Sequence, residues 1–337
     1  MAQIKIVFFE TTTKEKNYIK KKFSKDFEIL FSPETLTESS IPSFISEVSV
    51  ISPFIYSDIS TKVISKAKKL KLISTRSTGF NHIDLTAAKK REISVANVPY
   101  YGENTVAEHT FALILALSRN LHKAYVRTIR NDFSLSGLQG FDLREKTLGV
   151  IGAGSIGVHV IKMAKGFGMK VIATDTKPNH ILTELLDFNY VSLDELLSRS
   201  DIITLHCPYN QHTHHLINMN NIKKIKKGAL FINTARGGII EPKALYYAVE
   251  KGIFGGAGLD VFEGEELIRE ENQMLTKNVS VEHLETLLKT NILLKRENVI
   301  ITPHMAFDSI EAVERILDTT VENIKSFFEG KNYHKVI

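Results

Sequence analysis

The chain has 337 residues, of which 43% are hydrophobic and 24% are charged, and its formal net charge is +5. This length and apolar content exclude an intrinsically disordered chain and predict two globular units. Because basic and acidic residues are interspersed, the mild positive charge favours solubility and small anionic ligands over nucleic acid. The single cysteine excludes an internal disulfide, which favours a cytoplasmic protein. The longest apolar run, Phe111 to Leu117, is shorter than the roughly 18 residues of a membrane span, so no membrane association is predicted.

Apolar runs of strand length alternate with helical patterns almost from end to end, which predicts doubly wound parallel sheets covered by helices on both faces. The predicted strands are Ile4–Phe8, Val48–Ile51, Leu72–Thr75, Thr147–Ile151, Lys170–Thr174, Ile202–His206, Ala229–Asn233, Gly256–Asp260 and Val299–Thr302. One charged segment, Gly264 to Arg296, breaks the rhythm, with a helical pattern in Val281 to Leu288. We interpret it as a compact insertion lying over the sheet.

A glycine motif, GAGSIG, follows one predicted strand and opens a helix. Gly152, Gly154 and Gly157 suit a tight turn, close approach of a pyrophosphate to the backbone and close packing of helix on strand. Ser155 and Ile156 begin the helix, whose free N–H groups and positive dipole end attract phosphate. The motif therefore predicts a dinucleotide site, the alternative being a glycine turn with a purely structural role.

Asp175 ends the next predicted strand, 18 residues after Gly157. A carboxylate at this position can accept hydrogen bonds from both ribose hydroxyls of the dinucleotide. It would also repel the additional phosphate of NADP, so NAD is the predicted cofactor.

Three further polar residues follow predicted strands in the same half of the chain. They are Arg236 after "FINTA", Glu265 in "GLDVFEGE" and His304 in "VIITPHMAF". In open parallel sheets the carboxyl ends of the strands form the ligand crevice, so distant residues meet there. An arginine, a glutamate and a histidine are the set that reversible reduction of a 2-oxo acid requires.

The chain resembles the D-isomer-specific 2-hydroxyacid dehydrogenase family over essentially its whole length, and within it the D-lactate dehydrogenase branch most. The motifs that carry the resemblance, in order, are RSTGFNHIDL, NVPYYGENTVAEHT, LGVIGAGSIG, LHCPYNQHTHHLIN, NTARGGII, GLDVFEGE and ITPHMAF. The resemblance implies a Rossmann NAD-binding domain, residues 101–302, and a discontinuous flavodoxin-like substrate domain, residues 1–100 and 303–337. It also implies an active site in the cleft between them and a homodimer.

The resemblance assigns a role to each member of the polar set. Arg236 would bind the substrate carboxylate and polarise its carbonyl, because a guanidinium fork matches a carboxylate. His304 would be the acid–base group, and Glu265 would pair with it and favour its charged form. The same resemblance places further residues in the substrate site, namely Thr78, Gly79 and Tyr101, and beside the cofactor, namely Cys207, Pro208, Thr234, Ala235 and Asp260.

Alternatives remain open on substrate and on class. The 2-oxo acid could be pyruvate, a bulkier acid, hydroxypyruvate or glyoxylate, since apolar side-group contacts differ by only a few kcal/mol. Some relatives act as NADH-sensing corepressors, a binding function that the Arg, Glu and His set does not exclude. The histidines of LHCPYNQHTHHLI do not have a known zinc spacing, so no metal is predicted there.

Overall fold

The computed structural model describes residues 3–265, 288–289 and 291–337. The chain divides into two compact units, Met1–Tyr101 with Ser309–Ile337, and Gly102–Asp308. We call them unit 1 and unit 2. Of the predicted insertion Gly264 to Arg296, most residues, including nearly all of the helical pattern Val281 to Leu288, lie outside the described residues.

Unit 1 is built on a parallel sheet whose strand order is β2-β1-β3-β4-β5 in the described chain. Its elements are β1 (Ile4–Phe8), α1 (Thr13–Lys22), β2 (Phe27–Phe31), the 3₁₀ helix η1 (Ser43–Glu47), β3 (Val50–Ser52), α2 (Thr61–Lys66), β4 (Leu72–Ser74), α3 (Leu85–Lys90), β5 (Ser94–Ala96) and α13 (Ile310–Glu329). This order is the flavodoxin-like one, with its topological switch point between β1 and β3.

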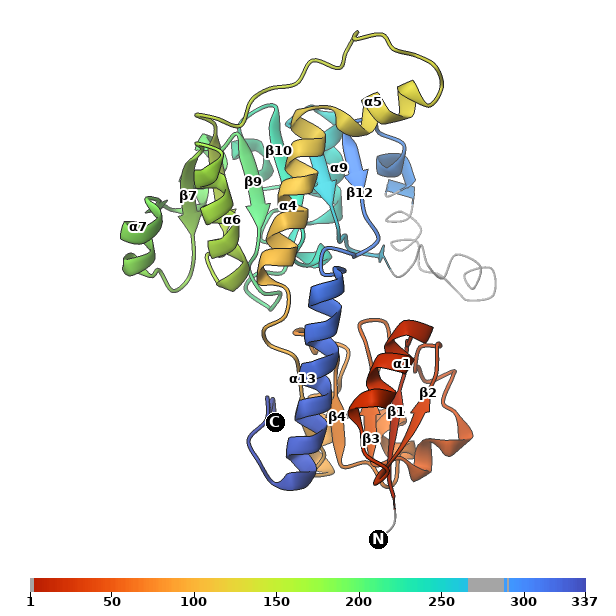
Figure 1. Cartoon of the computed structure of the whole chain (residues 1–337). Coiled ribbons are helices and arrows are strands. Elements are labelled where there is room, and N and C mark those ends of the chain that lie inside the picture. The colour runs from red at the N-terminus through yellow and green to blue at the C-terminus, as the bar shows by residue number, and fades with distance from the viewer. Residues whose placement is uncertain (1–2, 266–287, 290) are drawn as a thin grey trace. The chain divides into compact units, whose positions relative to one another are not determined.

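Helices cover both faces of the unit 1 sheet, and the alternation along β1 shows why. Ile6 and Phe8 are fully buried on one face, in a cluster with α1 and α13, whereas Val7 is buried on the other with α2 and α3. Figure 1 shows α1 and α13 beside the strands of this sheet. A parallel strand that is buried on both faces needs consecutive apolar residues, and Ile6, Val7 and Phe8 supply them, all three buried.

Unit 2 is a second parallel sheet, whose described strands run in the order β12-β11-β10-β9-β6-β7-β8. Its elements are α4 (Glu103–Ser118), α5 (Leu121–Thr128), β6 (Thr147–Ile151), α6 (Ser155–Gly166), β7 (Lys170–Thr174), α7 (His180–Leu186), β8 (Asn189–Tyr190), α8 (Leu193–Arg199), β9 (Ile202–Leu205), η2 (Ile222–Lys224), β10 (Ala229–Asn233), η3 (Gly237–Ile239), α9 (Pro242–Glu250), β11 (Phe254–Leu259) and β12 (Val299–Ile301). The chain crosses from β8 back to β9 beside β6, so the switch point lies between β6 and β9, as in Rossmann folds.

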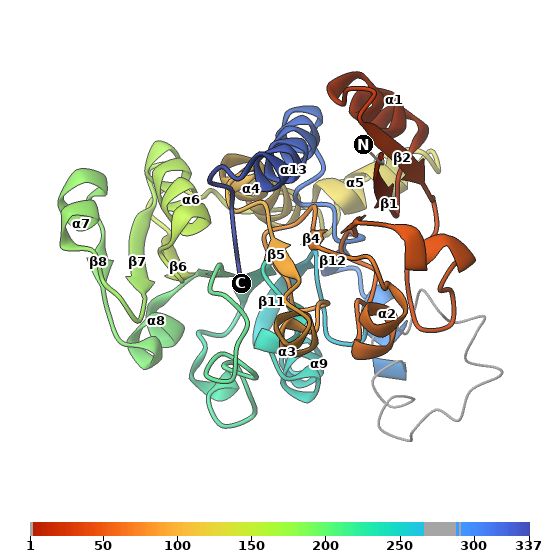
Figure 2. The same cartoon turned by 90° about the horizontal axis from the view of Figure 1, so that it is seen from below.

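The two faces of the unit 2 sheet carry separate apolar clusters. One joins the sheet to α4 and α6, and the other joins it to α8 and α9. Figure 2 shows these two pairs of helices on opposite sides of the strands. The predicted α/β class with two doubly wound parallel sheets is therefore confirmed. In the described part of the chain, no helix is both long enough and apolar enough to cross a bilayer.

Candidate active site

The glycine motif forms the turn between β6 and α6, at the switch point of unit 2. Gly152 has φ +95°, and a Cβ on it would lie 2.6 Å from the Cys207 nitrogen, in the loop after β9. A Cβ on Gly157 would lie 2.1 Å from the Gly152 carbonyl oxygen. Both positions therefore require glycine because the protein itself leaves no room.

Gly154 is different, because its surroundings leave space. An added Cβ would meet nothing within 4 Å, and its backbone is extended at φ −75° and ψ −160°. It lies on the wall of an open hollow together with Ser155, at the start of α6, and Asp175. Open space above a glycine, beside the free N–H groups of a helix N-terminus, fits a pyrophosphate close to the backbone.

Asp175 follows β7 and faces the same hollow. One carboxylate oxygen accepts from the Ala153 N–H at 2.8 Å, and the other accepts from the Lys177 N–H at 2.8 Å. These bonds fix the carboxylate, and each oxygen keeps a lone pair for a further donor. This arrangement suits acceptance from the hydroxyls of a ribose.

The loop after β9 contributes Cys207 and Pro208 to the other side of the switch point. Burial raises the pKa of the Cys207 thiol to about 11, with a smaller contribution from Asp175. Burial also lowers the pKa of His206 to about 3. Both side chains are therefore neutral near pH 7, and neither adds charge beside the glycine turn.

Arg236 lies after β10, where the buried Asn233 shapes the turn. The Asn233 side chain accepts from the Ala235 N–H at 3.0 Å and donates to the Arg236 carbonyl at 3.0 Å. Thr234 is buried, and its hydroxyl contacts that of Thr110 on α4 at 2.9 Å. The Arg236 side chain is half-buried, and it donates one hydrogen bond to the Ala235 carbonyl at 2.7 Å.

His304 and Glu265 are paired: the His304 Nδ1 lies 3.1 Å from a Glu265 carboxylate oxygen, and the two side chains are 19% and 23% exposed. His304 has φ +55°, which is uncommon for a residue with a side chain. Its N–H donates to the carbonyls of Asp260 and Thr302 at 3.0 and 2.9 Å. Arg236, Glu265 and His304 follow β10, β11 and β12, which are neighbours in the sheet.

Asp260 has a second role, as the anchor of a loop, that the sequence did not reveal. It is 1% exposed, and its carboxylate accepts from the Thr302 hydroxyl at 2.6 Å and from the Met305 and Ala306 N–H groups at 2.9 Å each. These donors lie on both sides of His304. His109 on α4 contacts the same network, 3.1 Å from the Thr302 hydroxyl. Asp260 thus holds the loop that presents His304.

In unit 1, Thr78 and Gly79 lie in the loop after β4. The Thr78 hydroxyl donates to the Val98 carbonyl at 2.7 Å, and the Gly79 carbonyl accepts from the Ser77 hydroxyl at 2.6 Å. Tyr101 ends the first segment of unit 1, and its carbonyl accepts from Arg315 at 2.6 Å. The loop is thus held by its own hydroxyl groups.

The remaining histidines of LHCPYNQHTHHLI make local contacts. His214 stacks on His215 and lies 3.0 Å from the Tyr209 hydroxyl, whereas His215 lies 2.7 Å from the Glu263 carboxylate. Within the described ranges, no group of three His, Cys, Asp or Glu side chains is arranged to hold a metal ion.

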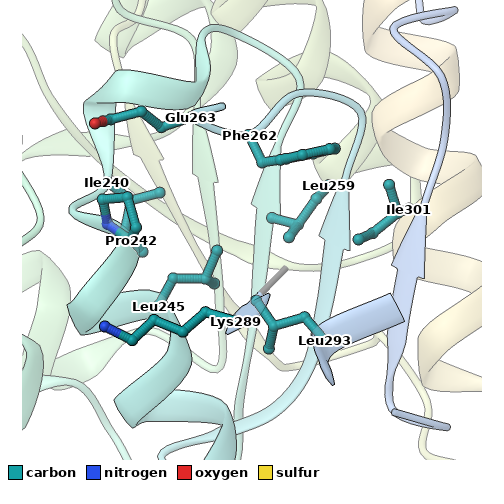
Figure 3. Close-up of a pocket in the computed structure, with 9 residues that line it drawn as sticks. All are labelled: Ile240, Pro242, Leu245, Leu259, Phe262, Glu263, Lys289, Leu293 and Ile301. Atoms are coloured by element: carbon teal, nitrogen blue, oxygen red, sulfur yellow. The ribbon is translucent and has the colours of Figure 1, made fainter. Parts of the chain in front are cut away.

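A small pocket lies between α9 and the strands β11 and β12 of unit 2 (Figure 3). Leu245, Leu259 and Ile301 point into it, and its volume of about 10 Å³ is room for a single water molecule. The pocket is too small and too apolar for a carboxylate substrate.

The fold and the glycine turn of unit 2 define a dinucleotide-binding Rossmann domain. A family model described as the NAD binding domain of D-isomer specific 2-hydroxyacid dehydrogenases matches residues 111–306. A D-lactate dehydrogenase of Escherichia coli is 35% identical over 97% of this chain and 98% of its own. An aromatic 2-oxoacid reductase of Clostridium sporogenes is 41% identical over 77% of this chain and 76% of its own.

A solved structure agrees with these sequence matches. The D-lactate dehydrogenase of Aquifex aeolicus, complexed with NAD and lactic acid, has a TM-score of 0.86 at 39% identity, covering 96% of each chain. The present chain belongs to the D-isomer-specific 2-hydroxyacid dehydrogenase family and is an NAD-dependent oxidoreductase. The predicted family, enzyme class and cofactor are thereby confirmed.

Proposed function

We propose that the enzyme is a D-lactate dehydrogenase, which converts pyruvate, NADH and a proton to D-lactate and NAD⁺. The observation that carries the proposal is the placement of Arg236, Glu265 and His304 after three neighbouring parallel strands, with His304 and Glu265 3.1 Å apart. The relatives named D-lactate dehydrogenase support pyruvate as the substrate.

The cofactor, when bound, supplies the hydride that reaches the carbonyl carbon of the substrate. Arg236 binds the substrate carboxylate through its planar fork and draws electron density from the carbonyl. His304 donates a proton to the carbonyl oxygen, where negative charge develops, and takes it back from the hydroxyl in the reverse direction.

Glu265 performs two tasks for His304. The carboxylate lies 3.1 Å from Nδ1, where it balances the positive charge of the ring while the ring carries the proton for the substrate. The same hydrogen bond fixes the ring, leaving Nε2 as the nitrogen that exchanges a proton with the substrate. In unit 1, we propose Thr78, Gly79 and Tyr101 as further substrate-binding residues.

The assignments of cofactor contacts belong to the same proposal. The pyrophosphate would lie over Gly154 and against the N–H groups of Ser155 and Ile156, and Asp175 would hold the ribose. The nicotinamide end would lie beside four residues at the ends of strands β9, β10 and β11. These are Cys207, Thr234, Ala235 and Asp260, with Pro208 in the same loop as Cys207.

The test is the initial rate of NADH oxidation with pyruvate, 2-oxobutyrate, phenylpyruvate, 2-oxoisocaproate, hydroxypyruvate and glyoxylate, with NADPH as the second cofactor and with product chirality assigned. Fast reduction of pyruvate to the D-isomer with NADH supports the proposal. Preference for phenylpyruvate would favour the alternative that the aromatic 2-oxoacid reductase suggests. No turnover of any acid would refute a reductase and revive the corepressor-like binding function.

A His304→Ala variant tests the acid–base role directly. We expect it to lose about 100-fold or more in turnover, the usual contribution of a general acid, while NADH binding is retained. His180→Ala is a matched control, because His180 is exposed on α7. A His304→Ala variant as active as this control would refute the assignment.

Two further parts of the proposal concern assembly and location. Large apolar side chains are exposed on α5 and in the loop that follows it, which runs across unit 2 in Figure 1. They are Leu121, Tyr125, Ile129, Phe133 and Leu135, each more than 60% exposed. Because exposed apolar residues of this kind mark an interface, we assign them to contact with a second copy of the chain.

Light scattering tests the dimer. The measured mass should be twice the 37.9 kDa chain mass, and Phe133→Glu should lower that mass. We place the dimer in the cytoplasm, in line with the single cysteine.

A further inference from the structure

Glu10 occupies an unusual backbone position at the carboxyl end of β1. Its φ is +53°, in the left-handed region that favours glycine and asparagine. The position is at the switch point of unit 1, where the chain leaves β1 on one side and β3 on the other. In a sheet with this strand order, ligands bind at that switch point.

The Glu10 carboxylate binds the whole loop that follows β3. One oxygen accepts from the N–H groups of Phe54 and Ser57 at 3.1 and 3.0 Å and from the Ser57 hydroxyl, and the other accepts from the Tyr56 N–H at 3.0 Å. The loop, residues 53–57, has no helix or strand to satisfy these donors. A single carboxylate therefore sets the conformation of the loop.

Arg76 lies against the same loop and is 1% exposed. Its guanidinium donates to the carbonyls of Phe9 and Glu10 and pairs with Glu15 at 3.1 Å, and it lies 5.2 Å from the centre of the Phe54 ring. Burial lowers the pKa of Arg76, whereas Glu15 and Glu10 raise it. An arginine stays charged in such surroundings.

The backbone of Arg76 connects this loop to the one proposed to bind the substrate carboxylate. The Arg76 N–H donates to the Pro53 carbonyl at 3.0 Å, and Thr78 and Gly79 follow two and three residues later. This hydrogen bond joins the loop 53–57 after β3 to the loop after β4 that carries Thr78 and Gly79, at the carboxyl ends of two neighbouring strands.

We propose that Glu10 is a positioning residue that determines which 2-oxo acids the enzyme accepts, by fixing the loop 53–57 that bounds the substrate side group. The inference rests on the proposed function. It requires that Glu10 act through the loop, so changing it should alter substrate binding and selectivity more than the chemical step.

Glu10→Gln is the main variant. Its amide keeps the shape of the side chain, but the NH₂ group must face backbone N–H donors in either orientation, so the loop loses acceptors. Losing one charge-assisted hydrogen bond predicts a rise in KM for the preferred 2-oxo acid of about tenfold or more. We expect kcat to fall less than KM rises, the ratio of kcat/KM between pyruvate and phenylpyruvate to move towards one, and the Kd for NADH to be unchanged.

Glu28→Gln is the matched control. Glu28 lies on β2 of the same sheet, and its carboxylate pairs with Lys5 at the surface, 3.3 Å away. We expect wild-type KM and selectivity from this variant. If Glu10→Gln fails to fold, Ser57→Ala replaces it, because it removes one of the four hydrogen bonds to Glu10.

Hydrogen exchange of the free enzyme tests the anchoring without any substrate. The amides of Phe54, Tyr56 and Ser57 should exchange faster in Glu10→Gln than in Glu28→Gln. Unchanged exchange, or a Glu10→Gln enzyme with a lower Tm but wild-type KM and selectivity, would overturn the role of Glu10 alone. A wild-type enzyme that reduces no 2-oxo acid would instead overturn the proposed function, and the specificity role with it.

Discussion

Asp260→Asn should impair turnover although Asp260 is not proposed to exchange a proton with the substrate. Its carboxylate, 1% exposed, accepts from the Thr302 hydroxyl and the Met305 N–H through one oxygen, and from the Ala306 N–H through the other. The loop that these bonds hold contains His304, whose left-handed backbone conformation needs such support.

The magnitude follows from the donors that the amide cannot satisfy. In its best orientation asparagine keeps the oxygen that accepts two bonds and places its NH₂ against the Ala306 N–H. Losing a hydrogen bond to a charged group costs about 1.5–3 kcal/mol. If this cost falls on the productive loop conformation, kcat falls roughly 10- to 100-fold.

The assay is kcat, KM and NADH affinity with the preferred 2-oxo acid, beside an Asp201→Asn control. Asp201 accepts from the Thr147 N–H at 2.8 Å and from Lys226 at 2.6 Å, at the amino ends of the strands of the same sheet. The control should lose stability but keep kcat. Equal kcat in the two variants would refute the reasoning, and a loss of NADH affinity alone would show that Asp260 serves the cofactor and does not position His304.

Three further outcomes can be checked. Gly154→Ala should keep the wild-type Tm but weaken NADH binding about tenfold or more, whereas Gly157→Ala should lower Tm, since only its Cβ would meet the backbone. Cys207, the single cysteine, has a pKa raised to about 11, so its reaction with Ellman's reagent at pH 8 should be about 100-fold slower than that of free cysteine. The reaction rate should then rise about tenfold for each pH unit, until the pH approaches 11. The pKa of His206 is lowered to about 3, so the unfolded chain takes up a proton below about pH 6.5 that the folded chain does not. Stability is therefore lost as the pH falls from 6.5 towards 3, by about 2 kcal/mol at pH 5, and the urea midpoint of the wild type should fall more than that of His206→Asn.

Strands covered on both faces were predictable from the sequence. The predicted bounds of β1, β6, β7 and β10 agree with the structure, because a parallel strand between two layers of helices is built mainly from apolar residues. The edge strand β2 was missed. All of its residues are partly exposed, and Glu28 interrupts its apolar pattern. The other edge strand of unit 1, β5, has three residues, and the edge strand β8 of unit 2 has two, which is too few for either to show a periodicity.

In the candidate site, the sequence reveals the residues that interrupt a local pattern and does not reveal the long-range contacts that hold them. The glycines of the turn and the polar residues after β10, β11 and β12 are visible because each interrupts a local pattern. The partners of Asp260 and Glu10 are not visible, since they lie 42 to 47 residues away in sequence and are mostly backbone N–H groups. Every residue except proline has a backbone N–H, so the residue type of the donor does not indicate such a contact.

Three loops are held in the same way, each by a side-chain oxygen that accepts hydrogen bonds from the backbone of the loop. Asn233, Asp260 and Glu10 each stand at or just after a strand end, and each accepts a backbone N–H of a loop proposed to serve the reaction. A loop outside helix and strand has unsatisfied donors, so a side-chain oxygen takes the place of a carbonyl. The reacting side chains can then be held in one geometry while their own polar atoms stay available to the substrate. Substituting an anchor should therefore change where a reacting group stands and leave its chemistry intact, which is the difference that separate measurements of KM, kcat and hydrogen exchange resolve.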